Sequence, residues 1–493
     1  MTMNKIISNK IIFFILFLIA FVVIFSSTYN PFNFRRMHVD SAAYITVTQG
    51  IIRGQLPYKD FVDNKGPLTY LISVPGFYLG GFTGIWITEL LLMFISVLFS
   101  YKIALFFSEQ RKALFGTILS FITLIIFFTV NAGTEEYSLP FLTISLYIFT
   151  KYYFSNKNEI GFVYLIILGI CFISSVLIRI NMFPLWAGFC SIILIELIIK
   201  RRFILIFKYI LGFLLGILFI LLPVFLYLFL NDILNEFIRQ VIVAGASRGF
   251  SDNFKEVIKN YYIVISRGNS SLPLFIGLFL LITKYKTNEF FYYIGYVFSY
   301  ILTLLFLSFS SGGSHYNIVL IPFFVPAIIV LVNILDNAFC EIKYKDIILI
   351  FFTCFLFSEG ILKYINDFSK MLYEKSGINM VYAGKIIDEN TKPGDKILSL
   401  ENSYIYPFTK RDPVSKYFYQ GSGISAIANS TEDFYNDVFT KKPVIIAILT
   451  ANEHYYDRYG YFQPIFDLID KEYHLLSNDY GYNLFIRVDR NNK

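Results

Sequence analysis

Long apolar runs alternate with short polar connectors along most of this chain. Many of these runs reach the roughly 20 residues that an α-helix needs to cross the hydrocarbon core of a bilayer. The pattern therefore predicts an α-helical polytopic membrane protein with about eleven transmembrane helices. The predicted spans lie near residues 11–29, 84–107, 113–131, 137–153, 160–178, 183–199, 207–230, 271–284, 289–308, 316–335 and 346–361.

Basic residues are concentrated in alternate connectors between these spans. If the N-terminus, with Lys5 and Lys10, is cytoplasmic, every loop on its side of the membrane is short and rich in Lys and Arg. Cytoplasmic loops of membrane proteins show this excess of positive charge. An odd number of spans then places the polar tail outside. We therefore predict a multi-pass protein of the cytoplasmic (plasma) membrane, with a cytoplasmic N-terminus and an extracytoplasmic C-terminal tail.

The tail differs in composition from the rest of the chain, because turn signals and β-prone runs alternate in it. Its length of about 130 residues is enough for an independent core. We therefore expect a transmembrane domain over 1–361, including the outer loops 30–83 and 231–270, and a C-terminal α/β or α+β domain over 362–493. The tail signals are the turn KPGD (392–395), the runs KILSL (396–400) and KPVIIAIL (442–449), and a hairpin over 474–488.

Composition supports the membrane assignment and narrows the chemistry. The chain is 56% hydrophobic and only 16% charged, whereas soluble proteins are about 25% charged. The net charge of +7 belongs to membrane loops, so it predicts no nucleic-acid partner. The few histidines are scattered and the cysteines lack zinc-type spacing. There is no P-loop, dinucleotide fingerprint or serine-nucleophile elbow. We expect no metal site and no cofactor.

The first outer loop, residues 30–83, is long for a connector. Apolar residues at helical spacing predict two short helices, over 40–54 and 67–79, that lie along the membrane surface. Asp40 would begin the first of them, near its cap. The length and polarity of this loop make it the first place to look for chemistry.

The other outer loops also hold selected polar groups. Ionisable side chains at membrane depth are costly and tend to mark function. Carboxylates together with cations suit an anionic lipid headgroup and a proton acceptor. The groups in question are Glu135, Glu136, Arg179, Arg248, His315 and Tyr316.

A recognisable pattern runs from His38 to Tyr70. An aspartate, Asp40, follows the first span, and G-x-L-P-Y-x-D-F-x-D-x-K-G-P-L-x-Y begins at Gly54. This resembles the polytopic glycosyltransferases of the C superfamily (GT-C), in particular bacterial relatives of dolichyl-phosphate-mannose–protein mannosyltransferases and of lipid A aminoarabinose transferases. The segments YSLPFLTISLYIF (137–149), HYNIVLIPF (315–323) and AGKIIDENTKPGDKILSL (383–400) agree with it.

The resemblance implies a GT-C-like fold and an enzyme of the cell envelope that transfers a hexosyl or pentosyl sugar. The donor would be a polyprenyl-phosphate-linked sugar, and the acceptor a lipid, glycan or protein outside the cytoplasm. Two departures from the family are that Asp40 is followed by Ser41 rather than by a second acidic residue, and that Lys-Gly-Pro replaces Lys-Pro-Pro. The expected reaction is a single displacement with inversion, in which a carboxylate removes the proton of the acceptor hydroxyl.

The resemblance and the outer-loop residues together suggest three roles. We expect catalysis by Asp40, Glu135 and Glu136, with Asp40 as the base. Cations that meet the leaving phosphate stabilise the charge it gains in the transition state; we expect these to be Lys65, Arg179 and Arg248. Substrate positioning is expected of Tyr44, Tyr58, Asp63, His315 and Tyr316.

Plainer roles compete with each assignment. Asp40 could cap a helix, Asp60 and Asp63 could form turns beside Pro57 and Gly66, and Lys65 could contact headgroups. Glu135 and Glu136 could stabilise a helix start, Arg179 could anchor at the interface, and His315 could be structural. Three other functions are open: a transporter or flippase of lipid-linked sugars, a GT-C-like polymerase or ligase of whole glycans, and a non-catalytic membrane scaffold with an outer binding domain.

Overall fold

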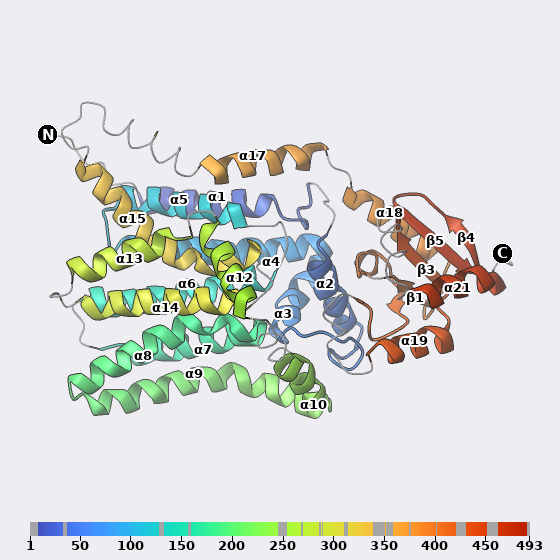
Figure 1. Cartoon of the computed structure of the whole chain (residues 1–493), viewed down its shortest axis with the longest axis horizontal. Helices are drawn as coiled ribbons and strands as arrows, with labels where there is room; N and C mark the ends of the chain where they lie inside the picture. Colours follow the sequence, from blue (N-terminus) through green and yellow to red (C-terminus); the bar gives the residue numbers. More distant parts are fainter. Residues whose placement is uncertain are drawn as a thin grey trace. The chain divides into compact units, whose positions relative to one another are not determined.

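The computed structural model of the chain forms two compact units, each built from segments that are distant in sequence (Figure 1). Unit 1 comprises Met1–Ser27, Trp86–Leu226 and Gly249–Leu372, and unit 2 comprises Thr28–Ile85, Tyr227–Arg248 and Tyr373–Lys493. The structure describes residues 8–32, 37–127, 133–155, 159–244, 254–267, 270–284, 287, 289–309, 314–338, 351, 358–373, 376–400, 402–420, 430–450 and 462–490.

Unit 1 is α-helical. Several of its helices pack pairwise along their length, namely α8 with α14, α6 with α7 and α5 with α15. The helices are α1 (Asn9–Phe25), α4 (Ser73–Ala104, from Trp86), α5 (Gln110–Phe127), α6 (Thr134–Phe154), α7 (Phe162–Ile178), η1 (Ile180–Met182), α8 (Pro184–Ile199), α9 (Phe203–Leu230, to Leu226), α12 (Phe254–Ser266), α13 (Leu272–Thr283), α14 (Phe290–Ser308), η3 (Ser314–Leu320), α15 (Ile321–Ala338) and α17 (Ser358–Tyr373, to Leu372).

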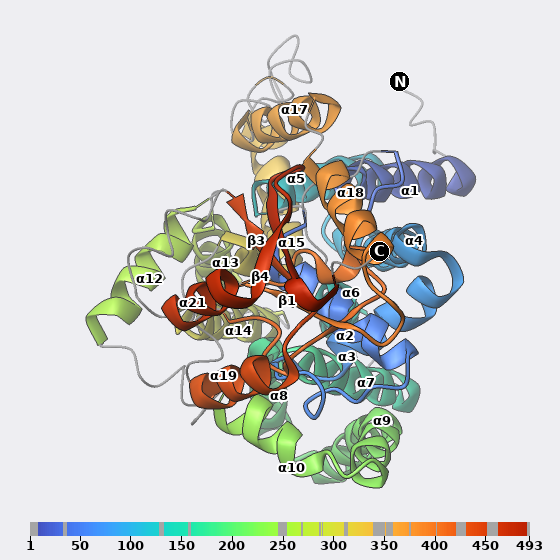
Figure 2. The same ribbon diagram turned by 90° about the vertical axis from the view of Figure 1, so that its right-hand side faces the viewer.

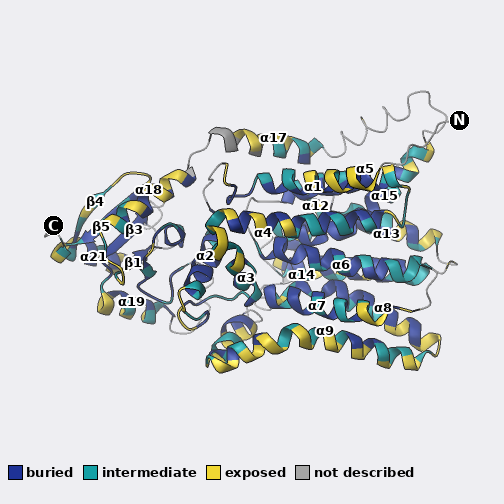
Figure 3. Cartoon of the chain, turned by 180° about the vertical axis from the view of Figure 1, so that it is seen from behind, coloured by how far each residue is buried: buried dark blue, intermediate teal, exposed yellow. Residues whose placement is uncertain are grey.

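The polytopic membrane architecture predicted from the apolar runs is confirmed. Six stretches of described helix are long and apolar enough to cross a membrane, and α1, α7 and α13 are shorter apolar helices. Apolar side chains remain exposed along α9 (Figure 3), as expected of a helix that faces lipid. The first ten predicted spans each overlap a described helix. Most of the eleventh, 346–361, lies outside the described residues.

Unit 2 combines the first outer loop with the tail and a short central segment. Its elements are α2 (Val39–Ile52), α3 (Leu68–Leu71), the start of α4, α10 (Leu234–Phe237), η2 (Ile238–Val243), α18 (Ser376–Glu389), β1 (Lys396–Ser399), η4 (Tyr406–Phe408), β2 (Asp412–Pro413), α19 (Ser430–Lys441), β3 (Ile445–Leu449), α21 (Gln463–Glu472), β4 (Tyr473–Ser477), β5 (Tyr482–Arg487) and η6 (Val488–Arg490).

The tail contains a mixed sheet, of which β1, β3 and β4 are labelled in Figure 2. The sheet has five strands in the order β2-β1-β3-β5-β4. β1 pairs with β2 and β3 in parallel, while β5 pairs with β3 and β4 antiparallel. The predicted strands and the predicted hairpin are therefore confirmed. All five residues of β3 are buried, so both faces of this central strand are covered. Val62, from the first outer loop, joins the apolar cluster that α19 and α21 form with the sheet.

The first outer loop contains both expected helices, the second of them in two pieces that end at Gly80 and Gly81. The pattern predicts helices over 40–54 and 67–79; α2 confirms the first, whereas the second range is divided between α3 and α4. Pro75 is tolerated because it lies in the first turn of α4, where its missing N–H costs no intrahelical bond. The break comes later, at Gly80 and Gly81. Gly81 has a φ of 57°, which glycine adopts without steric cost.

Gly50 tests how tightly α2 packs on the loop that follows it. A Cβ at this position would lie 2.3 Å from the Phe61 ring, so Gly50→Ala forces the ring or the helix to move. Such overpacking costs about 1–3 kcal/mol, and we expect a lower Tm in detergent. Gly80→Ala is the matched control, because no atom lies within 4 Å of the added Cβ. Equal melting of the two variants would contradict the packing described here.

Candidate functional site

Asp40 lies in the first turn of α2, and its carboxylate is partly exposed. The side chain of His38 caps this helix, since its Nδ1 accepts the N–H of Asp40 at 3.4 Å. The capping role considered for Asp40 therefore belongs to His38. Within the described part of the chain, no basic side chain forms an ion pair with the Asp40 carboxylate. The carboxylate is thus available to an incoming ligand.

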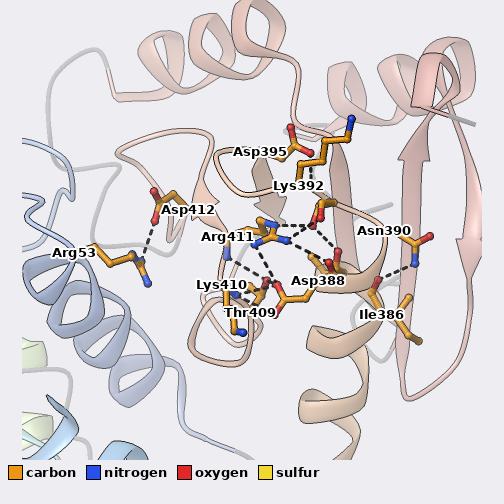
Figure 4. Close-up of polar contacts among 12 residues, drawn as sticks. Arg53, Ile386, Asp388, Asn390, Lys392, Asp395, Thr409, Lys410, Arg411 and Asp412 are labelled. Atoms are coloured by element: carbon orange, nitrogen blue, oxygen red, sulfur yellow. Dashed lines mark hydrogen bonds and ion pairs between the residues drawn. The ribbon is translucent and has the colours of Figure 1, made fainter. Parts of the chain in front are cut away.

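Residues of the tail hold α2 along its whole length. The Ser403 hydroxyl donates to the carbonyl of Val39 at 3.1 Å, directly before Asp40. In the last two turns, Gln49 Nε2 donates to the carbonyl of Pro407 at 3.0 Å. At the end of the helix, Arg53 and Asp412 form an ion pair at 2.9 Å (Figure 4). The position of Asp40 therefore depends on the C-terminal domain as well as on its own loop.

The tail segment that makes these contacts is itself cross-linked by Arg411, which is 7% exposed. Its Nε donates to Thr391 Oγ1 at 2.7 Å, and its Nη2 donates to the carbonyl of Thr391 at 2.8 Å. Asp388 accepts a hydrogen bond from Thr409 Oγ1 at 2.7 Å and from the backbone N–H of Lys410 at 3.0 Å. This network ties the end of α18 to the chain that leads into β2.

The loop between α2 and α3 is a tight, pinned turn. Asp60 accepts the N–H of Leu56 at 2.7 Å, which is the turn-forming role expected of it. Val62 N–H donates to the carbonyl of Lys416 at 2.9 Å. Tyr58 has a φ of 68°, in the left-handed region that is costly for a residue with a side chain. Its hydroxyl donates to the carbonyl of Lys65 at 2.8 Å.

Asp63 and Lys65 follow this turn and interact electrostatically with each other. Burial raises the pKa of the Asp63 carboxyl, while Lys65 and the phenol of Tyr70 act to lower it, and Asp40 acts to raise it. The structure therefore brings Asp40, Asp63 and Lys65 within electrostatic range. No acidic group forms an ion pair with the Lys65 ammonium among the residues that the structure describes.

Tyr58 and Tyr70 interact electrostatically with Asp63, and Tyr44 packs against Tyr70. The rings of Tyr44 and Tyr58 each meet the ring of Tyr70 edge-on, with centroids 6.3 Å and 6.4 Å away. Burial raises the pKa of Tyr58 and of Tyr70 well above the usual range, so both phenols stay neutral and can donate hydrogen bonds. Tyr70 was not among the predicted site residues, although it ends the motif that begins at Gly54; its position there was the available signal.

Unit 1 contains a second cluster, at the start of α6. The Glu135 carboxylate is 2% exposed and accepts hydrogen bonds from the Arg179 guanidinium and from Thr134 Oγ1. Arg179 sits in the break between α7 and η1, and its Cζ lies 4.3 Å from the centroid of the Tyr316 ring. The ring of His315 lies 4.2 Å from that of Tyr316. Glu135, Arg179, His315 and Tyr316 are therefore neighbours.

Glu136 is also buried but is bonded differently from Glu135. Its Oε2 has no hydrogen-bond partner within the described parts of the chain. Glu89, on α4, interacts electrostatically with Glu136 and accepts a hydrogen bond from Ser27 Oγ at 2.7 Å. Sequence inspection missed Glu89, because a single acidic residue inside an apolar run gives no sign of which face it occupies.

The predicted site residues are thus divided between the two units. Arg248 lies outside the described residues. No group of three or more His, Cys, Asp or Glu side chains is placed to hold a metal ion in the portion of the chain that is described. The residues found in unit 2 are Asp40, Tyr44, Tyr58, Asp63 and Lys65, and those in unit 1 are Glu135, Glu136, Arg179, His315 and Tyr316.

A family model described as the competence-induced protein Ccs4 N-terminal domain matches residues 3–346. The match covers well over half of the 493 residues. The chain belongs to this family. The matched residues 3–346 include Asp40, Asp63 and Lys65. The C-terminal tail of this Ccs4-family chain lies beyond them. A search of the curated proteins finds no match.

Solved structures with the same fold come from bacteria and archaea. ArnT from Cupriavidus metallidurans, in the apo state, has a TM-score of 0.64 at 12% identity, over 97% of this chain and 98% of that chain. The same protein bound to undecaprenyl phosphate has a TM-score of 0.64 at 11% identity, over 97% of each chain.

AglB from Archaeoglobus fulgidus, an oligosaccharyltransferase in complex with an inhibitory peptide and a dolichol-phosphate, has a TM-score of 0.52 at 12% identity. The alignment covers 97% of this chain and 74% of that chain. ArnT and AglB are both GT-C proteins. The GT-C-like fold expected from residues 38–70 is therefore confirmed over nearly the whole chain.

Proposed function

We propose that the protein transfers a sugar from a polyprenyl-phosphate donor to an acceptor at the outer face of the cytoplasmic membrane, with inversion. The observation that carries this proposal is the group in unit 2, where Asp40 and Lys65 are both partly exposed and both interact electrostatically with Asp63. A base and a phosphate-binding cation are the two groups that this reaction requires of a protein. The GT-C-like fold shared with ArnT supports the same reaction class.

Lys65 is the proposed ligand of the donor phosphate. Its backbone carbonyl accepts the Tyr58 hydroxyl at 2.8 Å, so the residue projects from a fixed point of the turn. As the glycosidic bond breaks, the polyprenyl phosphate gains negative charge. A cation held in place beforehand stabilises that charge more in the transition state than in the ground state, and so increases the rate.

Asp40 is the proposed base. It begins a helix whose start is fixed by Ser403 and whose cap is supplied by His38, so the carboxylate is not needed for capping. The bond that forms joins the acceptor oxygen to the anomeric carbon, and the bond that breaks joins that carbon to the phosphate oxygen. The proton of the acceptor hydroxyl passes to Asp40, and the electron pair leaves with the phosphate.

Glu136 is the proposed positioning carboxylate of unit 1, because Glu135 is already bonded to Arg179 while Glu136 Oε2 has no partner within the described residues. A sugar or acceptor hydroxyl would satisfy this oxygen. Tyr44, Tyr58 and Asp63 are proposed to position the donor, and His315 and Tyr316 to support Arg179. Arg179 and Arg248 remain proposed ligands of the phosphate.

The proposal is tested with the purified full-length protein in detergent. Radiolabelled polyprenyl-phosphate sugars are offered one at a time with a lipid and wall-glycan extract as acceptor. Consumption of one donor, with the label recovered in acceptor, supports the proposed class and names the sugar. Movement of intact donor across a liposome membrane without consumption would instead support a flippase. Transfer of whole glycans but not of single sugars would support a ligase.

Lys65→Met should weaken the interaction of the protein with the donor and leave its interaction with the acceptor unchanged. Loss of one charge-assisted contact to the phosphate is worth about 1.5–3 kcal/mol, so we expect kcat/KM for the donor to fall about tenfold or more, with little change in KM for the acceptor. Lys59→Met is the matched control, because Lys59 lies in the same loop, is exposed and forms no ion pair with a described residue. Equal kcat/KM values for the donor in the two variants would remove Lys65 from the phosphate site.

A further inference from the structure

Among the polar side chains of residues 234–243, that of Gln240 is the most deeply buried. It is 1% exposed, whereas Ile242 is 40% and Val243 is 58% exposed. The residue lies in η2, a π-helical turn that ends with Ala244 N–H donating to the carbonyl of Arg239. π-Helical turns are rare and frequently occur at functional sites.

The amide of Gln240 joins the two ends of the turn in the first outer loop. Its Nε2 donates to the carbonyl of Tyr58 at 2.7 Å and to Glu236 Oε2 at 3.2 Å. Its Oε1 accepts the backbone N–H of Asp63 at 3.2 Å. A buried amide is costly unless it is hydrogen-bonded, and here both ends of the amide are used.

These bonds act on the residues that the proposed reaction needs. Tyr58 holds a left-handed backbone conformation, which persists only where the surroundings enforce it. Gln240 enforces it through the Tyr58 carbonyl, and the Tyr58 hydroxyl in turn holds the carbonyl of Lys65 at 2.8 Å. Gln240 therefore fixes Asp63 directly and Lys65 by way of Tyr58.

We propose that Gln240 is a positioning residue that holds Asp63 and Lys65 in the geometry that receives polyprenyl phosphate. This inference rests on the proposed function. Gln240 acts through the backbone of the turn and touches no substrate. The π-helical turn supplies the change of helical phase that directs Gln240 and Val241, two consecutive residues, into the interior.

The structural half of the proposal is tested by hydrogen exchange on the full-length protein in detergent. In Gln240→Met, the amides of residues 58–65 should exchange at least tenfold faster, while those of α2 and β3 keep wild-type protection. Asn333→Leu is the control, because Asn333 also bridges two groups: its Nδ2 donates to the carbonyl of Phe107 at 3.0 Å, and its Oδ1 accepts Ser108 Oγ at 3.0 Å. It should leave residues 58–65 unchanged.

The functional half is tested by binding of tritiated undecaprenyl phosphate to the same preparations. Gln240→Met should raise Kd about tenfold. Gln240→Glu keeps the acceptor for Asp63 N–H but places a buried carboxylate oxygen against the Tyr58 carbonyl and Glu236 Oε2, so its Kd should rise at least as much as that of Gln240→Met. If Gln240 acts through Lys65, the double variant Gln240→Met with Lys65→Met should bind no more weakly than Lys65→Met alone. A role in folding alone would leave the Kd of the folded fraction unchanged.

The outcomes separate this inference from the proposed function. Unchanged exchange in Gln240→Met, or faster exchange with an unchanged Kd, overturns the positioning role while the proposed function stands. A wild-type protein that neither binds undecaprenyl phosphate nor consumes any donor overturns the proposed function, and the positioning role falls with it. Faster exchange in Gln240→Met together with a raised Kd supports both the positioning role and the proposed function, provided that Gln240→Met no longer raises the Kd when Lys65 is already methionine.

Discussion

Replacement of Asp40 by asparagine should reduce the rate of sugar transfer by about 10²–10⁴-fold without unfolding the protein. The amide has nearly the same shape as the carboxylate but cannot remove the proton from the acceptor hydroxyl. The helix start should survive, because its cap comes from His38 and its contact with the tail from Ser403. The measurement is single-turnover transfer from the donor identified by the panel, with Tm recorded on the same sample.

Asp60→Asn is the matched control for Asp40→Asn. Asp60 lies in the same outer loop, and its carboxylate accepts only the N–H of Leu56 among the described groups, at 2.7 Å. The asparagine carbonyl oxygen can accept the same bond, so this variant should keep the wild-type rate. If Asp40→Asn turns over as fast as Asp60→Asn, Asp40 is not the base, and Asp63, within its electrostatic range, becomes the carboxylate to replace next.

Replacement of Arg179 by methionine should destabilise the helical unit strongly. The Glu135 side chain is 2% exposed and the Arg179 side chain that pairs with it is 15% exposed. Arg179→Met therefore leaves the buried Glu135 charge without its counter-ion. Breaking a buried pair from one side costs about 3–5 kcal/mol, and Arg179 also loses its contact with the Tyr316 ring. We expect a lower Tm and a lower yield of monodisperse protein, measured by thermal melting in detergent.

The double variant Arg179→Met with Glu135→Met separates loss of the pair from loss of packing. It removes both charges, so most of the lost stability should return. Lys208→Met is the control for loss of an ordinary ion pair, because Lys208 and Glu159 are both at least 33% exposed. Exposed pairs contribute about 0–1 kcal/mol, so this variant should melt close to wild type. If Arg179→Met melts like Lys208→Met, the buried pair is not a stabilising element.

Local patterns in the sequence were sufficient for the membrane architecture and for the tail strands. Apolar runs long enough to span a bilayer specify helices, because unpaired backbone groups are not tolerated in lipid. The β-prone runs at 396–400 and 442–449 and the hairpin over 474–488 became β1, β3 and the β4–β5 pair. The motif from Gly54 to Tyr70 was likewise enough to predict the GT-C-like fold, because its residues follow one another along the chain and can be compared directly with the family.

The sequence was less informative where a helix boundary depends on position within a turn. A helix over 67–79, separate from the following span, was expected, and the helical stretch does end at Gly80 and Gly81. It passes through Pro75, however, and is divided at Ile72 instead. Proline reads as a breaker from sequence, but in the first helical turn it removes no hydrogen bond. Whether a proline breaks a helix can therefore be predicted only when the first residue of the helix is known. Here α4 begins at Ser73, directly after the short helix α3.

What the sequence by itself determined is the class of molecule: a polytopic membrane chain with a mixed-sheet tail, and an aspartate and a lysine in one polar loop. Only the tertiary structure decided which distant groups hold that loop. Gln240 is 177 residues from Asp63 and Ser403 is 364 residues from Val39, and neither belongs to a motif. Hydrogen bonds between such positions leave no periodic signal, because they depend on how separate segments pack rather than on the order of neighbouring residues.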